Sequence, residues 1–151
     1  HRTWSYNEIS RRYTDFDIQF YEPEEFRTQH KSNRQASNTE ELINPIVACP
    51  PFTQWKRDAA EAIRLHNKTA KQMFNNLLEA GVCREQARGV LPQNMYTEYY
   101  ASANLNNILK FIDLRTHEGA QWEIQKMAEA MLEIISKLYP ATVKAYRELK
   151  E

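Results

Sequence analysis

The chain has 151 residues, enough for one domain, and its 20 Lys and Arg side chains balance 20 Asp and Glu side chains. A net charge of zero excludes a broad nucleic-acid-binding face, because DNA and RNA affinity depends on excess basic charge. It does not exclude a mononucleotide site, where two or three arginines can hold one phosphate. No apolar run reaches the roughly 18 residues of a membrane span. The two cysteines, Cys49 and Cys83, are too few for a disulfide framework or a zinc cluster. We therefore expect no metal site and a cytoplasmic location.

The first half of the chain is expected to hold one strand, a polar loop and a long helix. Apolar and polar side chains alternate over 15–21, which favours a strand with one buried face. Residues 27–39 are almost entirely polar and are predicted to form a loop, and prolines at 45, 50 and 51 indicate a connector. Thr53 is predicted to cap a helix that reaches about residue 80, with Gly81 as its left-handed C-terminal residue. The inward face of this helix is expected to hold residues spaced by three and four: Trp55, Ala59, Ile63, His66, Ala70, Phe74 and Leu77.

The second half is expected to be mostly helical. A short helix over 84–90 should end before Pro92, whereas 95–102 is left open between strand and helix. Further helices are predicted over 104–114, 120–138 and 141–149, with Pro140 separating the last two. The inward residues of the 120–138 helix are expected to be Ile124, Ala128, Met131, Ile135 and Leu138. The sum is a single α+β domain, residues 1–151, dominated by helices.

The first thirteen residues combine three arginines, a carboxylate, an imidazole and several small polar side chains. A site that binds a phosphate and a uracil-like ring needs this mixture. The Ser10 hydroxyl beside Arg11 and Arg12 suits a phosphate, and Glu8 can accept a hydrogen bond from a ribose hydroxyl or a ring nitrogen. A surface turn with scattered charge explains any one of these residues, but it explains the whole set poorly.

Two later clusters also carry polar groups that can meet a ligand. Arg88 lies in the short predicted helix before a Leu-Pro turn, where a solvated arginine is the alternative. Asn104, Asn107 and Lys110 recur every third residue and favour one polar helical face. Arg115 ends that helix, and the alternative there is a cation that simply complements the helix dipole.

The pattern HRxxSxNExSxRY over residues 1–13 resembles the signature of the flavin-dependent thymidylate synthases, and the two later clusters follow in that family's order. The resemblance extends to about residue 146. It implies a helix-rich α+β fold with a small, mainly antiparallel sheet, of which this chain is the C-terminal two-thirds. It also implies the reductive methylation of dUMP to dTMP, with methylenetetrahydrofolate as carbon donor, FAD as hydride carrier and NADPH as reductant. By the same resemblance, the protein is a homotetramer with shared active sites.

The resemblance also assigns roles to residues. Arg115 is expected to meet the pyrimidine and favour its ionised form, which makes it the catalytic residue. Asn106 stands where an arginine is common in the family, and Lys110 where an asparagine is common. The residues expected to bind dUMP are Glu8, Ile9, Ser10, Arg11, Arg12, Arg88 and Arg115. Those expected to bind FAD are His1, Arg2, Glu8, Asn104, Asn106 and Lys110.

Two other functions remain as alternatives. A nucleotide-binding or assembly module could keep this fold without catalysis, and a helical interaction domain could use the aromatic and apolar stripes alone. Neither alternative needs the whole polar set, which comprises Glu8, Ser10, Arg12, Arg88 and Arg115. Neither cysteine lies in a motif, so no cysteine nucleophile is expected, and Ser10 is expected to bind substrate because it has no evident base partner.

Overall fold

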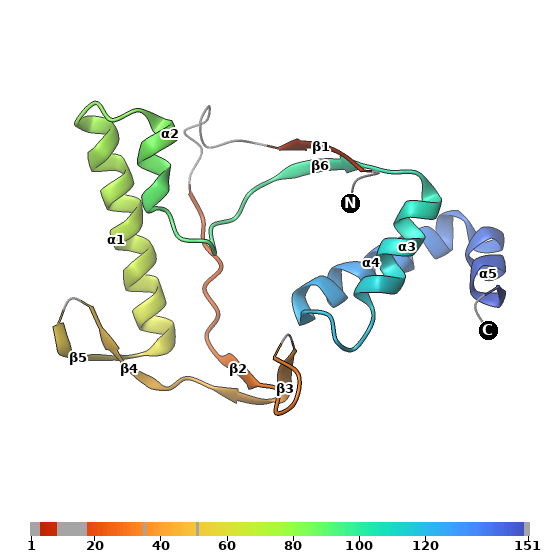
Figure 1. The fold of residues 1–151 in the computed structure, drawn as a ribbon, viewed down its shortest axis with the longest axis horizontal. Helices are drawn as coiled ribbons and strands as arrows, with labels where there is room; N and C mark the ends of the chain where they lie inside the picture. Colours follow the sequence, from red (N-terminus) through yellow and green to blue (C-terminus); the bar gives the residue numbers. More distant parts are fainter. Residues whose placement is uncertain (1–3, 9–17, 35, 51, 150–151) are drawn as a thin grey trace. The chain divides into compact units, whose positions relative to one another are not determined.

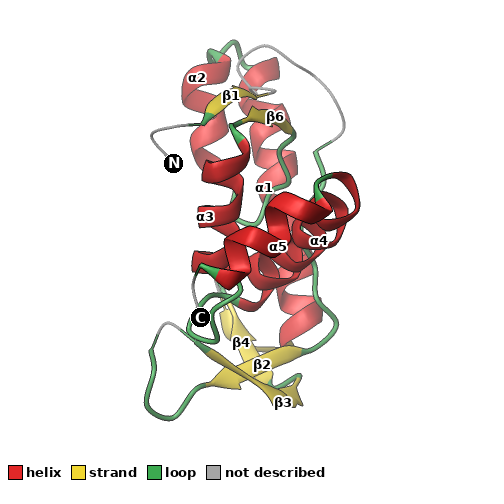
Figure 2. Cartoon of the chain, turned by 90° about the vertical axis from the view of Figure 1, so that its right-hand side faces the viewer, coloured by secondary structure: helices red, strands yellow, loops and turns green. Residues whose placement is uncertain are grey.

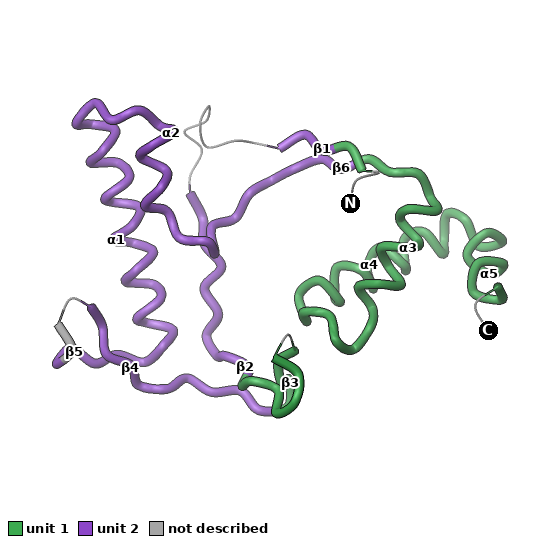
Figure 3. Tube along the Cα trace, viewed as in Figure 1, with its two compact units in different colours: residues 1–5, 28–40, 102–151 green, residues 6–27, 41–101 purple. Residues whose placement is uncertain are grey.

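The computed structural model describes residues 4–8, 18–34, 36–50 and 52–149. The chain forms two compact units, coloured separately in Figure 3. Unit 1 comprises residues 1–5, 28–40 and 102–151, and unit 2 comprises residues 6–27 and 41–101. The described residues contain five α-helices and three two-stranded sheets, which confirms the expected helix-rich α+β fold.

The long helix of unit 2 is α1 (Ala59–Glu79), seen in Figure 1. It begins after Asp58, not after the predicted Thr53. The Asp58 carboxylate accepts from the backbone N–H of Glu61 at 2.8 Å, and Asn44 Oδ1 accepts from that of Ala60 at 3.1 Å. These two side chains satisfy N–H groups that have no partner within the helix. At the other end Gly81 has a φ of 86°, so its predicted left-handed conformation is confirmed.

A hairpin precedes α1 and replaces the predicted connector and first helical turn. It pairs β4 (Ile46–Cys49) with β5 (Phe52–Asp58) in antiparallel register. Trp55 therefore lies on a strand and is 52% exposed, instead of facing inward from a helix.

The buried face of α1 consists of Ala60, Asn67, Ala70 and Phe74, so the prediction of an inward His66 is wrong. Asn67 is only 1% exposed, and its Nδ2 donates to Glu22 Oε1 at 2.8 Å. The predicted 84–90 helix is confirmed as α2 (Arg84–Ala87) followed by a 3-10 turn, η1 (Arg88–Val90). The core of unit 2 contains Ile18, Phe74 and Ala87, with partly buried Phe20, Leu77, Leu78, Val82, Leu91 and Met95 around them.

The predicted strand over 15–21 is not formed as expected. Residues 15–17 lie outside the described residues, and the remainder forms an isolated bridge between Phe20 and Met95. The segment over 95–102, which the sequence leaves open between strand and helix, is a strand in its second half. This strand, β6 (Tyr99–Ser102), pairs with β1 (Ser5–Glu8) (Figure 1).

Unit 1 contains the three predicted C-terminal helices, α3 (Leu105–Arg115), α4 (Trp122–Leu138) and α5 (Pro140–Glu148), shown in Figure 2. Pro140 is the first residue of α5, where its missing N–H costs nothing. Leu138 is 65% exposed, so the prediction that it faces the core is wrong. The buried core residues of this unit are Leu109, Ile112, Ile135 and Val143.

The segment predicted to be a polar loop contains two paired strands, β2 (Phe26–Gln29) and β3 (Ser37–Ile43). Gln29 Nε2 donates to the carbonyl oxygens of Asn33 and Ala36 at 3.1 and 3.0 Å, which closes the turn between them. Within the described part of the chain, no helix combines the length and the apolar character that a membrane crossing requires.

Candidate active site

The described part of the N-terminal motif is Trp4 followed by β1, and the last residue of β1 is Glu8. Glu8 Oε1 accepts a hydrogen bond from Thr97 Oγ1 at 3.1 Å. The rings of Tyr6 and Tyr99 meet edge to face with centroids 5.7 Å apart, which adds a cross-strand contact between β1 and β6. Residues 5–8 of the motif therefore form a paired strand that presents an exposed carboxylate. The other motif residues with expected roles lie outside the described residues: His1, Arg2, Ile9, Ser10, Arg11 and Arg12.

Arg88 begins the 3-10 turn η1 and is exposed. Its backbone N–H donates to the carbonyl groups of Arg84 and Gln86, and its own carbonyl accepts from the N–H of Leu91 at 3.1 Å. The neighbouring Ala87 is fully buried. The backbone of Arg88 is therefore held by hydrogen bonds, while its exposed guanidinium group can bind an anion at the surface.

Helix α3 carries the other expected site residues. Asn104 is its N-cap and accepts from the N–H of Asn107 through Oδ1 at 2.9 Å, so the donor half of its amide, Nδ2, is the part that can serve a ligand. Asn106 and Lys110 are exposed and four residues apart, which places them on the same side of the helix. Arg115 is exposed and is the last residue of α3.

The turn after Arg115 is braced by Gln125 of α4. Gln125 Nε2 lies within hydrogen-bonding distance of the carbonyl oxygens of His117, Glu118 and Ala120, at 3.2, 3.3 and 2.7 Å. Within the turn, the Gly119 N–H donates to His117 Nδ1 at 3.0 Å. The sequence analysis missed Gln125, because nothing in helical periodicity marks a side chain that turns back toward the carbonyl oxygens of a preceding turn.

Gly119 also allows a close approach between two parts of unit 1. A Cβ atom at this position would lie 3.3 Å from His117 Nδ1 and 3.6 Å from Asn33 Nδ2. The β2–β3 turn and the turn after Arg115 are therefore neighbours.

The expected site residues are distributed over both units. Glu8 and Arg88 belong to unit 2, whereas the four residues of α3 and its cap belong to unit 1: Asn104, Asn106, Lys110 and Arg115.

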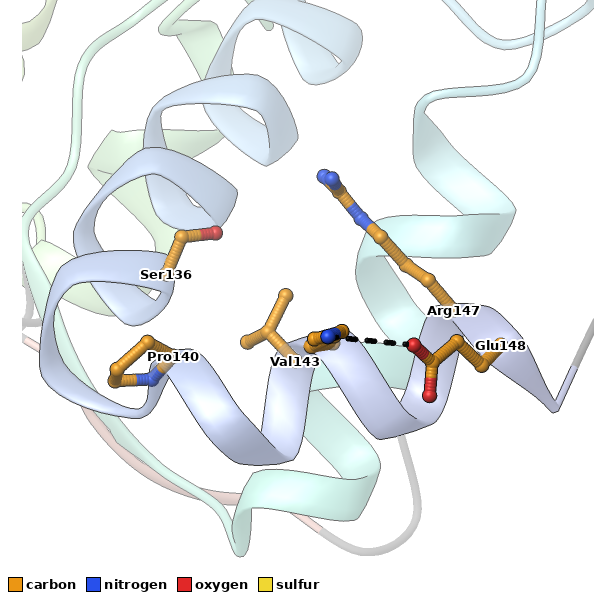
Figure 4. Close-up of a pocket in the computed structure, with 6 residues that line it drawn as sticks. Ser136, Pro140, Val143, Arg147 and Glu148 are labelled. Carbon is orange, nitrogen blue, oxygen red and sulfur yellow. Dashed lines mark ion pairs between the residues drawn. The ribbon is translucent and has the colours of Figure 1, made fainter.

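A surface pocket of about 280 Å³ lies between α4 and α5 (Figure 4). Lys144 and Glu148 form an ion pair of 3.8 Å beside it, and Arg147 extends from the same helix. The pocket contains none of the expected ligand-binding residues, so we do not assign the active site to it. Its lining consists of Ser136, Pro140, Val143, Lys144, Arg147 and Glu148.

The cysteines do not form part of a described site. Cys49 is buried and Cys83 is exposed, and both are free thiols. Among the residues that the structure describes, no group of three or more His, Cys, Asp or Glu side chains has a metal-binding arrangement.

Comparison with known proteins identifies relatives along almost the whole chain. The flavin-dependent thymidylate synthase of Thermus thermophilus is 41% identical over 148 residues, covering 98% of this chain and 50% of its own length. The enzyme of the same name from Kosmotoga olearia is 39% identical over 149 residues, covering 97% of this chain and 59% of its own. The chain thus spans about half the length of the first of these relatives.

A solved structure shares the fold. The UMP/dUMP methylase PolB from Streptomyces cacaoi, bound with 5-Br UMP, superposes with a TM-score of 0.74 at 29% identity. The match covers 97% of this chain and 65% of that one. The family described as thymidylate synthase complementing protein matches residues 1–141, a span that contains the motif, Arg88 and Arg115. The chain therefore belongs to the thymidylate synthase complementing protein family, that of the flavin-dependent thymidylate synthases.

Proposed function

We propose that the protein to which this chain belongs is a flavin-dependent thymidylate synthase. It converts dUMP to dTMP, with methylenetetrahydrofolate as the carbon donor, FAD as the flavin and NADPH as its reductant. The observation that carries the proposal is the 41% identity to the Thermus thermophilus enzyme over 98% of this chain. Two exposed arginines support it, because their guanidinium groups suit a nucleotide anion. They are Arg88, the first residue of η1, and Arg115, the last residue of α3.

The proposed nucleotide site combines charge for the phosphate with charge for the pyrimidine. Ser10 and Arg12 bind the phosphate, with Glu8, Ile9 and Arg11 also at the nucleotide, and Arg88 contributes a further cation. Arg115 contacts the pyrimidine. A guanidinium there stabilises the negative charge that grows on the ring as the ring carbon becomes nucleophilic, so it lowers the barrier as well as the energy of the complex.

The proposed flavin contacts come from Glu8, Asn104, Asn106 and Lys110, together with His1 and Arg2. The donor set fits FAD, because the amide Nδ2 atoms and the Lys110 ammonium are donors and the cofactor presents phosphate and carbonyl oxygens. The cap of α3 occupies only Oδ1 of Asn104, which supports this use of its Nδ2. Bound FAD supplies the hydride chemistry, while the protein binds, orients and provides the electrostatic environment.

We also infer that the protein is a homotetramer in a reducing, cytoplasmic environment. An exposed apolar stripe on α4, formed by Met127, Ile134 and Leu138, supports self-association. Two free thiols, one of them exposed, are compatible with a reducing compartment.

A turnover assay tests the proposal. The full-length protein is purified and its flavin absorption spectrum is recorded, then dTMP is measured after addition of dUMP, methylenetetrahydrofolate and NADPH. We expect bound flavin, a spectral change on addition of dUMP, and dTMP that depends on all three additions. Flavin-free protein that binds dUMP without turnover would instead support a non-catalytic nucleotide-binding module.

The same assay should be repeated with UMP. The structural relative from Streptomyces cacaoi is described as a UMP/dUMP methylase and was solved with both 5-Br UMP and 5-Br dUMP. Turnover of dUMP with little turnover of UMP supports the thymidylate synthase assignment, whereas equal use of both assigns the broader nucleotide methylase activity.

A further inference from the structure

A four-residue segment of unit 2, residues 94–97, contacts Glu8 within the motif and residues 19–21 beyond its end. On one side Thr97 Oγ1 donates to Glu8 Oε1 at 3.1 Å. On the other side the Tyr96 N–H donates to the carbonyl of Gln19 at 2.9 Å. The Tyr21 N–H donates to the carbonyl of Asn94 at 2.9 Å, and Asn94 Nδ2 donates back to the Tyr21 carbonyl at 2.9 Å. One short segment therefore holds both Glu8 and residues 19–21.

Residues 18–24 are in turn attached to α1 through three side chains spaced along one face of that helix. Lys71 Nζ donates to the Ile18 carbonyl at 3.3 Å and Asn67 Nδ2 to Glu22 Oε1 at 2.8 Å. The third contact is the ion pair between Arg64 and Glu24 at 2.9 Å. Asn67 is almost completely buried whereas Glu22 is exposed, so the middle contact is partly shielded from water. Residues 94–97 therefore bond to a segment that is attached to the long helix α1.

We propose that Thr97 is a positioning residue for the ligand site and acts through Glu8. This inference rests on the proposed function, in which Glu8 contacts the nucleotide and the flavin. Thr97 engages Oε1, so Oε2 is the carboxylate oxygen available to a ligand. An exposed glutamate samples several rotamers, and a partner that selects one of them removes part of the entropy cost of binding.

Two features make a threonine suitable for this task. Its β-branched side chain has a restricted χ1 angle, so the hydroxyl is itself held in place. Both residues are exposed, so the hydrogen bond adds little to folding stability, and its effect falls on ligand binding.

The test is Thr97→Val in the full-length protein, because valine keeps the branched shape and removes the hydroxyl. The dissociation constants of dUMP and FAD are measured by calorimetry, and KM and kcat by turnover. We expect a threefold to tenfold increase, on the order of one hydrogen bond, in the Kd of the ligand that Glu8 contacts. KM for dUMP should rise similarly if that ligand is dUMP, with kcat within about twofold and an unchanged melting temperature. Thr97→Ser should recover most of the affinity.

Thr69→Val is the matched control. Thr69 Oγ1 also makes an exposed hydrogen bond, to the Leu65 carbonyl at 2.9 Å, but this bond lies within α1 and does not involve Glu8. This variant should bind both ligands like the wild type. In a Glu8→Ala background, Thr97→Val should cause no further loss, because the group through which it acts is gone.

The outcomes separate this inference from the proposed function. Wild-type protein that binds neither dUMP nor FAD overturns the proposed function and the inference that rests on it. An active wild type whose Thr97→Val variant matches Thr69→Val overturns only the positioning role. The role is also wrong if the loss of affinity persists in the Glu8→Ala background, or if Thr97→Val lowers the melting temperature and Thr97→Ser does not restore binding.

Discussion

Arg115 combines an exposed side chain with a firmly held backbone. The residue after it, Thr116, directs both its N–H and its hydroxyl to the Ile112 carbonyl, at 2.8 and 2.9 Å. Gln125 then binds the turn that follows. A side chain that must contact a reacting ring benefits from this arrangement, because small displacements of a catalytic group cost much of its effect.

Replacing Arg115 by alanine is expected to lower dTMP formation by about 100-fold to 1000-fold, since it removes a charge that stabilises the transition state. Flavin content and melting temperature should remain those of the wild type, because the side chain is exposed at the end of α3. Arg147→Ala is the control, an arginine of the same unit on α5 that lies beside the surface pocket. Turnover in Arg115→Ala close to that of Arg147→Ala would contradict the catalytic role.

Asn104 is expected to have two separable functions, one for each half of its amide. Asn104→Ala removes the N-cap of α3 and should lower the free energy of unfolding by about 1 kcal/mol, as well as weakening flavin binding. Asn104→Asp keeps an oxygen for the Asn107 N–H but has no donor, so stability should be retained while flavin affinity falls. Urea unfolding and flavin titration measure the two effects. If Asn104→Asp binds flavin normally, the residue is a helix cap and no more.

At the scale of elements, the start of α1 shows which local signals were decisive. Thr53 has no Glu or Gln three residues later, whereas Asp58 has Glu61 in that position, the sequence pattern of a capping box. That pattern was present in the sequence and favours the observed boundary. The burial of Asn67 is different, because its partner Glu22 is 45 residues away and no local pattern predicts the pair.

The residues of the candidate site also fall into two groups, those that local sequence signals predict and those that depend on tertiary contacts. Arg88 and Arg115 lie where helix-ending signals, Pro92 and a C-terminal cation, predicted them. Thr97 and Gln125 could not be recognised in the sequence, because each acts on a group brought near by tertiary folding. Helix-boundary signals therefore located the helical segments that carry Arg88 and Arg115, but not the strand that carries Glu8, nor Thr97 and Gln125.

Asp58 is expected to make the stability of α1 depend on pH. The hydrogen bond from the Glu61 N–H, followed by the contribution of the Asn44 side chain, lowers the pKa of the Asp58 carboxyl below 3.8. A lowered folded-state pKa means that this stabilisation is fully present above pH 3.8 and is lost as the pH falls through the folded pKa.

The measurement is urea unfolding of the wild type, Asp58→Ala and Asp58→Asn over about pH 3–6. The difference in the free energy of unfolding between the wild type and Asp58→Ala should be largest at about pH 6 and should decrease as the pH is lowered. Asp58→Asn, which keeps a capping oxygen without a titrating group, should keep its advantage over Asp58→Ala at all these pH values. A constant difference between wild type and Asp58→Ala would show that the carboxylate does not stabilise the helix.

At the scale of the whole molecule, the apolar stripe on α4 is the most informative surface. Met127, Ile134 and Leu138 are 46%, 58% and 65% exposed, and their spacing of seven and four places them on one side of the helix. Contiguous exposed apolar surface of this kind marks an interaction site. A second copy of the protein is the occupant that the proposed homotetramer implies.

Ile134→Glu in the full-length protein should therefore shift the assembly towards smaller species, because a buried, unpaired carboxylate in an interface is costly. Sedimentation velocity measures the change. Ala145→Glu adds the same charge at an exposed position on α5 and serves as the control. Unchanged assembly in Ile134→Glu would place the contact between subunits elsewhere.

The interleaving of the two units has a consequence for how the protein is made. Every residue of unit 2 has been added once the ribosome reaches Ala101, whereas residues 102–151, which include all three helices of unit 1, are still to come. At about 5–20 residues per second, these 50 residues correspond to several seconds of translation. The core of Ile18, Phe74 and Ala87 can therefore form on the nascent chain before the last helices of unit 1 have been synthesised. The order of synthesis therefore favours formation of the Glu8–Thr97 contact before helix α3.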